Sequence, residues 1–396
     1  MVRRLRGAAL VLVMPLGLVA QQRDTSSQGK VPADSTRPFV RGGVYDKPFQ
    51  FRLLGRTAIG GYAEVHARYQ RIDGVSDDSG IEAKRFNLFT STRVSDLVSM
   101  AAELEFEDGG HEIALEYAAI DLRIHPAFTV RGGMLLSPVG RFNLSHDSPL
   151  NEFTDRPLVS TQVLGVALSE PGVGALGRLP VGQLGRVTWE AYLTNGFHDG
   201  LVTASDAGTR IPLGRGNVED NNGSPALVGR LTYSPGLHHE VGLSVHRGAY
   251  NVSRVDGVRV DDRRDVRLTV LDAETSVLGI GLRGEFALAS VDIAPGLRGI
   301  YASAQRGVYA EATRDFGRGW VRTAPGSYFT LKGRVDQADF DRDRAGDSME
   351  QVTVGLNFRP TTDSVIKLDV VRGRSRDRFS NLSQHAFLLA SMATYF

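Results

Sequence analysis

The sequence has no cysteine and little lysine, and both shortages narrow its chemistry. Without cysteine there is no disulfide, no thiolate nucleophile and no cysteine-ligated metal centre. The 46 basic residues comprise only five lysines beside 41 arginines, and 45 acidic residues balance them. Charges that balance so closely produce no broad basic field, and we therefore expect no nucleic-acid partner.

Long apolar runs are also missing. The one extended apolar stretch, 8–18, follows three arginines within 3–6 and precedes Leu-Val-Ala at 18–20. This order predicts a signal peptide over 1–20, because the stretch is too short to span a bilayer. Its removal would leave 43 basic residues, 46 minus three, against 45 acidic ones. No other stretch reaches the roughly 18 apolar residues of a membrane helix, so a membrane crossing would need strands.

Most of the chain alternates between apolar and polar residues. Residues 21–57 are polar and aperiodic, and we interpret them as a periplasmic lead-in before a barrel over 58–396. In 98–107, for example, apolar residues hold the even positions and three glutamates hold odd ones. Successive strand side chains face opposite ways, so each run has one apolar and one polar face. The predicted runs are 58–71, 82–93, 97–107, 112–124, 127–136, 161–169, 184–197, 225–234, 238–249, 264–272, 275–289, 299–314, 326–337, 349–358, 364–373 and 385–396.

Two of these runs have additional features. The fourth slips in parity between Tyr117 and Ile120, which predicts a β-bulge. The last places Leu388 and Met392 on the same face as its terminal residue, Phe396. A closing strand with a terminal aromatic is what an outer-membrane barrel presents to the barrel assembly machinery, so we expect that machinery as a partner.

The connectors support a barrel. If the chain starts in the periplasm and changes sides with every run, most long polar connectors fall outside and most short ones inside. The exceptions are 108–111, short and outside, and 170–183 and 315–325, long and inside. We therefore predict an all-β fold, a 16-stranded antiparallel transmembrane β-barrel in the bacterial outer membrane. A soluble β-sandwich is the alternative, since its strands alternate too.

Residues 99–140 carry a more specific pattern. An acidic strand, a short loop and a second strand lead into a segment with Phe128, Val130, Arg131, Gly133, Pro138 and Gly140. This arrangement resembles the phosphate-selective porin O and P family, which has an aromatic-x-V-R-x-G-x-x-x-x-P-x-G segment there. The sequences Asn-Gly-Phe at 195–197 and Val-Gly-Leu-Asn-Phe at 354–358 also resemble that family.

The resemblance implies a 16-stranded, usually trimeric outer-membrane channel whose third outer loop folds into the lumen and narrows it. Residues 137–160 stand where that loop belongs. Mixed charge at a constriction orients solutes but selects the sign of an ion only weakly. The predicted constriction residues are Arg141, His146, Asp147, Glu152, Asp155 and Arg156.

The polar faces of the strands supply the predicted pore lining. The family implies that arginines and lysines draw anions, but here both signs mix and lysine is scarce, which departs from a phosphate-selective pore. We expect passive diffusion of small hydrophilic solutes, anions such as phosphate among them, with a weak preference of either sign. The predicted pore-lining residues are Arg68, Glu103, Glu105, Arg131, Arg186, Glu190, Arg230, Arg283, Lys332, Arg334 and Lys367.

Motifs for other chemistry are weak. No HExxH, GxSxG or phosphate-binding glycine loop occurs, so we expect no enzyme activity, no cofactor and no metal. Residues 339–343 space carboxylates as a calcium loop does, but the glycine comes only at 346 and arginines intervene, which favours a solvated loop. Outer-membrane lipid and a homotrimer are the other expected partners. A non-conducting barrel with a structural, adhesive or receptor role stays open, as does a hydrolase whose Ser, His and acid side chains meet only in space.

Overall fold

The computed structural model describes residues 47–48, 51–53, 56–125, 127–236 and 238–396. By internal contacts the chain divides into Met1–Arg37 and Pro38–Phe396, and the second unit holds every described residue. The predicted signal peptide, 1–20, lies outside the described residues, as does most of the predicted lead-in. The first long strand begins at Thr57.

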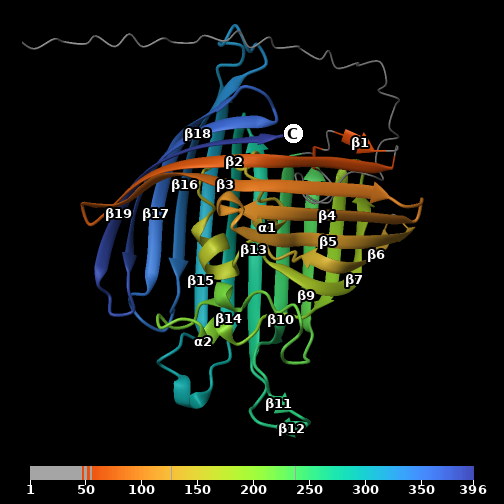
Figure 1. The fold of residues 1–396 in the computed structure, drawn as a ribbon, viewed down its shortest axis with the longest axis vertical. Helices are drawn as coiled ribbons and strands as arrows, with labels where there is room; N and C mark the ends of the chain where they lie inside the picture. Colours follow the sequence, from red (N-terminus) through yellow and green to blue (C-terminus); the bar gives the residue numbers. More distant parts are fainter. Residues whose placement is uncertain (1–46, 49–50, 54–55, 126, 237) are drawn as a thin grey trace, which may run out of the picture. The chain divides into compact units, whose positions relative to one another are not determined.

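Within the described residues, sixteen long strands form one closed antiparallel β-barrel (Figure 1). Each strand pairs with its neighbour in sequence, and β19 returns to pair with β2 over Tyr62–Ile72. The all-β, 16-stranded fold predicted from the alternation is therefore confirmed, and the soluble sandwich is excluded. The strands are β2 Thr57–Ile72, β3 Val75–Arg93, β4 Val98–Glu107, β5 Glu112–His125, β6 Phe128–Leu136, β7 Ser169–Val181, β8 Gly185–Thr194, β9 Ala226–Gly236, β10 His239–Ala249, β13 Asp265–Val277, β14 Ile280–Val291, β15 Ala304–Phe316, β16 Tyr328–Asp339, β17 Ser348–Arg359, β18 Ser364–Arg376 and β19 Leu382–Tyr395.

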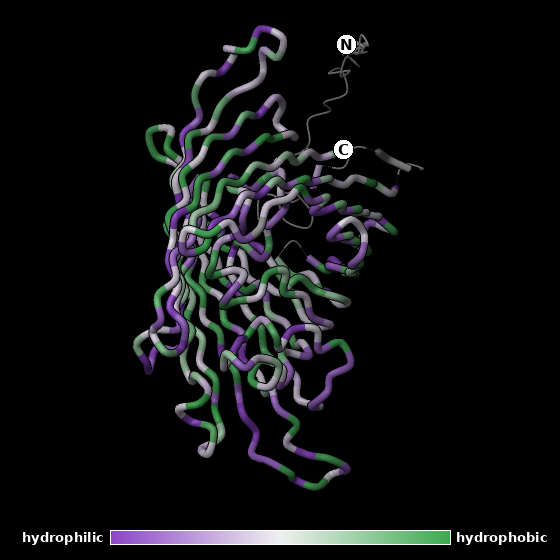
Figure 2. The backbone as a smooth tube through the Cα atoms, turned by 60° about the vertical axis from the view of Figure 1, so that its left-hand side comes forward, coloured by the Kyte–Doolittle hydropathy of each residue, from purple (hydrophilic) through white to green (hydrophobic). Residues whose placement is uncertain are grey.

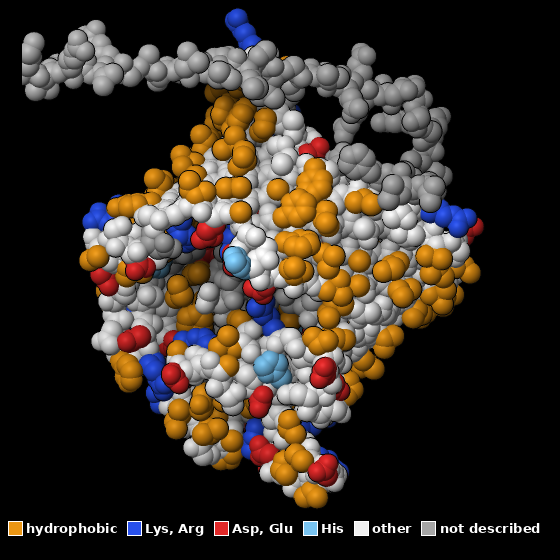
Figure 3. All heavy atoms as spheres, in the orientation of Figure 1, with side chains coloured by type: hydrophobic (Ala, Val, Ile, Leu, Met, Phe, Trp, Pro, Cys, Tyr) orange, Lys and Arg blue, Asp and Glu red, His pale blue; other side chains and the backbone are white. Residues whose placement is uncertain are grey.

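Figure 2 shows hydrophobic and hydrophilic residues alternating along the strands, and successive strand side chains face opposite sides of the wall. Along β18, Ile366 and Leu368 point outward and are 46 % and 50 % exposed, whereas Lys367 and Asp369 point inward and are at most 1 % exposed. Hydrophobic side chains cover the outer face over β3–β6 in Figure 3. A closed sheet leaves no unpaired strand edge, so this apolar exterior can face hydrocarbon.

A short strand completes the closure. β1, Phe51–Leu53, pairs with Thr57–Ile59 of β2, the part of β2 that lies beyond the end of β19. Between them, Gly61 and Phe396 exchange two backbone hydrogen bonds of 3.2 and 2.9 Å. The upstream segment and the last strand therefore share one edge of β2. We call the end of the barrel at which β2 begins the turn end, and the opposite end the loop end.

The sixth strand differs from the prediction. Residues 161–169 were expected to form it, but most of them lie in a π-helical segment, η3 Val159–Leu164, and the loop that follows. The strand is β7, Ser169–Val181, which we assigned to the connector 170–183. The β-branched residues of 161–169 pack inside the barrel and not in its wall. With β7 in place the turn to β8 is 182–184, so the long inner connector at 170–183 disappears.

Two smaller differences affect the wall. The connector predicted over 72–81 is a tight turn at 73–74, because β3 starts at Val75. The predicted β-bulge in the fourth run is present near its expected place: Glu103 pairs with Tyr117 and Leu104 pairs with Leu115, which leaves Glu116 as the extra residue. Both Glu116 and Tyr117 are consequently buried, at 4 % and 1 % exposure.

The other elements belong to the connections. At the loop end, L3 (137–168) contains α1 Arg141–Leu144 and η3, and L4 (195–225) contains α2 Gly200–Thr203 and η4 Ile211–Gly214. The β10–β13 connection carries a hairpin of β11 Arg254–Val255 and β12 Val258–Arg259. Two short 3₁₀ turns, η2 Asp108–Gly110 and η5 Pro295–Leu297, complete the set.

Candidate functional site

L3 folds into the barrel, and nearly all of its residues from 137 to 160 are buried. It meets two parts of the inner wall that differ in charge. We call the inner faces of β16–β18 the basic wall and the inner faces of β4 and β5 the acidic wall. The loop spans the lumen between them, which is the position expected for a constriction.

The basic wall holds the backbone of L3. Lys367 Nζ donates to the Ser148 and Phe153 carbonyl oxygens at 2.9 and 3.2 Å. Lys332 Nζ donates to the Glu152 carbonyl oxygen, and Arg334 Nη1 donates to that of Asp155 at 3.0 Å. Arg359 Nη1 reaches the Pro149 carbonyl oxygen at 2.9 Å. Four cations on three strands are therefore engaged by main-chain oxygens of one loop segment.

Carboxylates balance these cations. Lys332 Nζ lies 2.6 Å from Asp369 Oδ1, and both side chains are fully shielded from solvent. The contact crosses over Gly355 of β17, which pairs with Lys332 on one side and Asp369 on the other. A Cβ at Gly355 would stand 2.2 Å from Asp369 Oδ1 and 2.7 Å from Lys332 Cε. Only glycine leaves room for this cross-strand ion pair.

The acidic wall holds L3 through side chains. Asp147 accepts from Lys47 Nζ at 2.5 Å and from the Tyr395 hydroxyl at 2.8 Å, and Lys47 Nζ also lies 2.8 Å from Glu103. Lys47 belongs to the predicted lead-in, so one described residue of that segment enters the lumen. Burial alone would lower the pKa of Lys47, but Asp147 and Glu103 hold it well above its usual value. The ammonium group therefore stays charged.

His146 is the second contact on this wall. Its Nδ1 lies 2.9 Å from the Asn143 carbonyl oxygen and its Nε2 lies 2.8 Å from Glu116 Oε1. Burial, together with the charge of Arg156, lowers the pKa of His146 to about 4. The ring is therefore neutral near pH 7, with Nδ1–H donating to the carbonyl oxygen.

The beginning of L3 binds a third part of the wall. Arg141 lies 2.6 Å from Glu240 on β10 and 2.7 Å from Glu274 on β13. The Phe142 amide of α1 donates to Glu285 on β14 at 2.5 Å. The carboxylate sits at the first turn of a short helix, where free amide donors are available.

Part of the lumen is apolar. Residues of η3 and of L4 pack against inward-facing residues of β9, β13 and β14 in one buried cluster at the loop end. Burying such side chains is worth roughly 1.5–3 kcal/mol each. A uniformly polar inner wall, as the alternation suggested, is therefore not what the structure has. Members of the cluster include Val159, Val163, Leu201, Ile211, Val228, Val266, Leu268 and Ala287.

The structure places all eleven predicted pore-lining residues on the shielded face of the wall, and most of them make ion pairs. Arg131 pairs with Asp121 at 2.8 Å, Arg230 with Asp272 at 2.5 Å and Arg283 with Glu311 at 2.6 Å. The others with a charged or polar side-chain partner are Arg68 with Asp155, Glu105 with Asn87, Arg186 with Glu240, Glu190 with Tyr192 and Arg334 with Asp336.

The six predicted constriction residues lie together in L3, but they do not form one cluster. Arg141, His146 and Asp147 contact the walls described above. Glu152 pairs with Arg359 at 3.1 Å and accepts from Asn357 at 2.7 Å. Burial would raise the pKa of Glu152, but Arg359 and other cations hold it below its usual value. The Nε and Nη2 atoms of Arg156 make no hydrogen bond within the described residues.

Sequence reasoning missed Lys47, Glu116 and Arg359. Glu116 could have been found, since the parity slip that predicts the bulge also turns its side chain inward. Arg359 continues the alternation of the fourteenth predicted run, 349–358, which stops one residue before the end of β17. Lys47 gave no signal, because it stands in an aperiodic segment.

Two other groups of side chains lie apart from the L3 contacts described above. Ser137, Glu170 and His246 converge inside the barrel, with His246 Nε2 at 3.0 Å from Glu170 and the Ser137 hydroxyl donating to the same carboxylate. The carboxylate stands between the hydroxyl and the ring, so the ring cannot take the serine proton as a catalytic base must. The described residues contain no group of three or more His, Cys, Asp or Glu placed to hold a metal ion.

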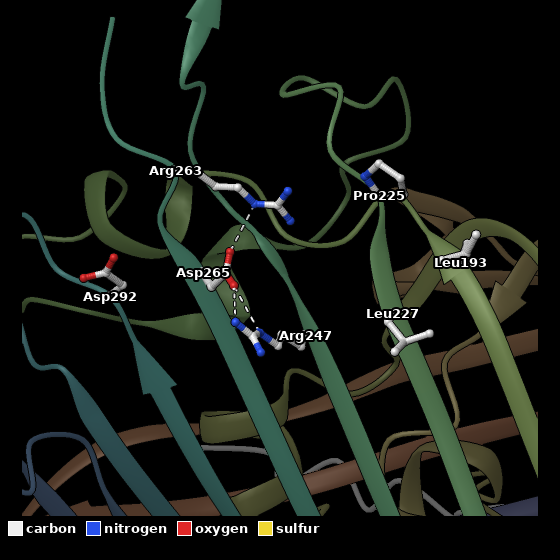
Figure 4. Close-up of a pocket in the computed structure, with 7 residues that line it drawn as sticks. All are labelled: Leu193, Pro225, Leu227, Arg247, Arg263, Asp265 and Asp292. Carbon is white, nitrogen blue, oxygen red and sulfur yellow. Dashed lines mark hydrogen bonds and ion pairs between the residues drawn. The ribbon is translucent and has the colours of Figure 1, made fainter. Parts of the chain in front are cut away.

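A groove on the outer face at the loop end is the other candidate (Figure 4). Leu193, Pro225 and Leu227 line one side. Asp265 lies between two arginines, at 2.9 Å from Arg247 and 3.3 Å from Arg263. The arginines are thus already paired, and the groove opens on the outside of the barrel, away from the lumen.

Among the described residues, no helix is both long and apolar enough to cross a bilayer.

No protein-family model matches this chain. An uncharacterized protein of Aquifex aeolicus (strain VF5) is 28 % identical over 225 residues, which are 54 % of this chain and 48 % of that protein. This chain therefore spans about half the length of that curated relative.

Solved structures with the same fold are outer-membrane proteins. The outer membrane channel DcaP of Acinetobacter baumannii superposes with a TM-score of 0.55 at 14 % identity, over 88 % of this chain and 100 % of that one. The anion-selective porin from Comamonas acidovorans gives 0.56 at 12 %, over 86 % and 99 %. Salmonella typhi OmpF, in complex with daunomycin, gives 0.54 at 11 %, over 86 % and 97 %. The porin fold and the apolar exterior place this chain in the bacterial outer membrane.

Proposed function

We propose that this protein is a porin for passive diffusion of small hydrophilic solutes, with L3 setting the bore. The observation that carries the proposal is a closed cylinder, apolar outside and charged inside, that an inward-folded loop crosses from the acidic wall to the basic wall. No catalytic step is needed. The loop end would face the outside of the cell and the turn end the periplasm, as the long connectors at the loop end favour.

Selectivity for the sign of an ion is proposed to be weak. Lys332 and Arg334, which could attract anions, are neutralised by Asp369 and Asp336 and also bind main-chain oxygens of L3. Paired charges contribute little net potential along a pore. Membership of the phosphate-selective porin O and P family remains a prediction. Strong preference for phosphate would require free cations, and Arg156 is the best candidate to supply one.

Single-channel recording tests the proposal. Purified full-length protein in planar bilayers should give discrete conductance steps that scale with salt concentration. In a tenfold potassium chloride gradient the reversal potential should lie near zero, far from the roughly 59 mV per tenfold ratio of an ideally selective pore. A strong anion preference would show that the paired arginines still dominate the lumen.

A non-conducting barrel is the second candidate, because one observation favours it. L3 and L4 fill part of the lumen with the apolar cluster, and Lys47 closes on L3 from the turn end. A bilayer that stays silent with correctly folded protein would support a structural, adhesive or receptor role and contradict the porin.

We also propose how the protein is inserted into the membrane and how its copies associate. Outer-membrane lipid would cover the apolar exterior, and the barrel assembly machinery would recognise β19 and Phe396. A homotrimer is expected for a porin of this fold. Native mass spectrometry in detergent should give about three times the mass of one chain, and a monomer only would contradict it.

A further inference from the structure

The ammonium group of Lys47 occupies a site that is built like a receptor for amines. It lies 2.8 Å from Glu103 Oε2 and 2.5 Å from Asp147 Oδ1, and both carboxylates are almost fully shielded from solvent. The Phe89 ring centroid is 5.3 Å from Nζ and that of Tyr117 is 6.0 Å away. Carboxylates combined with aromatic faces are the groups that recognise organic ammonium ions.

The carboxylates are held in place without the lysine. Glu103 Oε1 accepts from Asn87 Nδ2 at 2.8 Å, and Asp147 Oδ2 accepts from the Tyr395 hydroxyl at 2.8 Å. The Tyr62 ring packs edge-on against Tyr395, and its buried hydroxyl has no hydrogen-bond partner within the described residues. The site is therefore preorganised, and a hydroxyl group without a hydrogen-bond partner lies on the ring that packs against Tyr395.

Lys47 is not part of the wall that forms this site. It precedes β1 by only four residues and lies outside every strand of the barrel. Four extended residues span at most about 14 Å, so the lysine could leave the site by a local movement while the barrel stays intact. Its departure would leave Glu103 and Asp147 without their shared cation, facing the lumen beside L3.

We propose that Glu103, Asp147 and the surrounding aromatic rings form a binding site for primary-amine solutes, and that Lys47 occupies it as an internal ligand. A solute ammonium would replace the lysine ammonium on the same two carboxylates. The transport part of this proposal rests on the porin function proposed above. Occupancy by Lys47 does not, and it is tested separately.

The first experiment measures current block by 1,4-diaminobutane in planar bilayers. The variant Lys47→Met removes the internal ligand and keeps the length of the side chain, and Lys84→Met is the matched control. Lys84→Met removes the same charge, but Lys84 pairs with Asp108 and does not belong to the amine site. Lys47→Met should be blocked at concentrations at least tenfold lower than wild type or Lys84→Met. The neutral analogue 1,4-butanediol should block none of them.

A double variant distinguishes loss of the internal ligand from a general effect of removing a positive charge. Adding Asp147→Asn to Lys47→Met removes one carboxylate with little change in shape, and it should return the diamine sensitivity to the wild-type level. Equal sensitivity of wild type, Lys47→Met and Lys84→Met would overturn the amine site, even if all three conduct.

Acetylation of lysine amines measures whether Lys47 occupies the site. It needs neither a conductance measurement nor the variant Lys47→Met. In folded wild-type protein, N-hydroxysuccinimidyl acetate should modify Lys47 at least tenfold more slowly than Lys84, as peptide mass spectrometry would show. Asp147→Asn should speed the modification of Lys47 and leave that of Lys84 unchanged. If Lys47 reacts as fast as Lys84 in wild type, the site is not occupied and the inference fails, whether or not the protein conducts.

Discussion

The basic wall and the acidic wall both fasten L3, but they hold different parts of it. On β16–β18, lysine and arginine side chains donate to carbonyl oxygens, which every residue has. On β4 and β5, Glu116 contacts the His146 side chain directly, and Glu103 reaches the Asp147 side chain through the ammonium group of Lys47. A wall that binds main-chain oxygens tolerates changes in the sequence of the loop, whereas a wall that binds side chains depends on two specific residues. This difference can be tested by substitutions on each wall.

Removing a cation from the basic wall should have the largest effect. Lys332→Met would leave the charged Asp369 without its lysine partner in a fully shielded position, and such a loss costs about 3–5 kcal/mol. Thermal unfolding in detergent should show a clearly lower Tm. Lys84→Met, which breaks an exposed pair, should cost less than about 1 kcal/mol. Equal losses in the two variants would mean that the basic wall is not critical.

Gly355→Ala should damage the same ion pair without removing a charge. Its new methyl group would stand 2.2 Å from Asp369 Oδ1, so the carboxylate or the strand must move. Overpacking of this kind costs about 1–3 kcal/mol. Gly80→Ala on β3 is the control, because a Cβ there meets no atom within 4 Å. The Tm of Gly355→Ala should be lower than that of Gly80→Ala. If Gly355→Ala unfolds at the same Tm as wild type, the ion pair between Lys332 and Asp369 does not cross over Gly355.

Acid should act on the other wall through His146. Its pKa is lowered to about 4, against about 6.5 in an unfolded chain, so acidification charges the unfolded chain first. Its contribution to stability is complete above about pH 6.5 and is lost as the pH falls towards 4. His146→Asn should therefore lose less Tm between pH 7 and pH 4.5 than wild type. His238→Asn, at an exposed turn, should follow wild type, and parallel curves for all three would refute the assignment.

The smallest effect should come from a loop side chain opposite the basic wall. Glu152→Ala removes the ion pair with Arg359, yet Lys332 and Asn357 still donate to the Glu152 carbonyl oxygen. We expect a loss below about 1 kcal/mol. A Tm drop as large as that of Lys332→Met would show that side chains, and not main-chain oxygens, fasten L3 on this wall.

The alternation of side chains was sufficient to predict the barrel, because each residue of a strand reverses the face. It failed at 161–169, where Val163 and Leu164 of η3 and Val166 of the following loop resemble a strand but pack inside the lumen. It failed again at β7, where Pro171 and Pro180 argue against a strand although β7 pairs with β6 over Ser169–Leu176 and with β8 over Gly172–Val181. Local pattern cannot decide between wall and lumen when both environments are apolar.

The site was less predictable than the fold. The position of L3 and the inward face of Lys367 follow from spacing, but the contact of Lys367 with Ser148 joins residues 219 positions apart. Such a pairing depends on how the loop folds back, which no periodicity records. The role of Lys47 was out of reach for the same reason.

The short pairing of β1 with β2 has a consequence for the rim of the cylinder. The final strand stops at Tyr395, and beyond it Thr57–Ile59 of β2 obtain their second neighbour from residues upstream of them. Both extremities of the described polypeptide thus finish a single seam. Cutting the chain just before Thr57 would leave a notch of unmatched amide and carbonyl groups in an otherwise continuous ring.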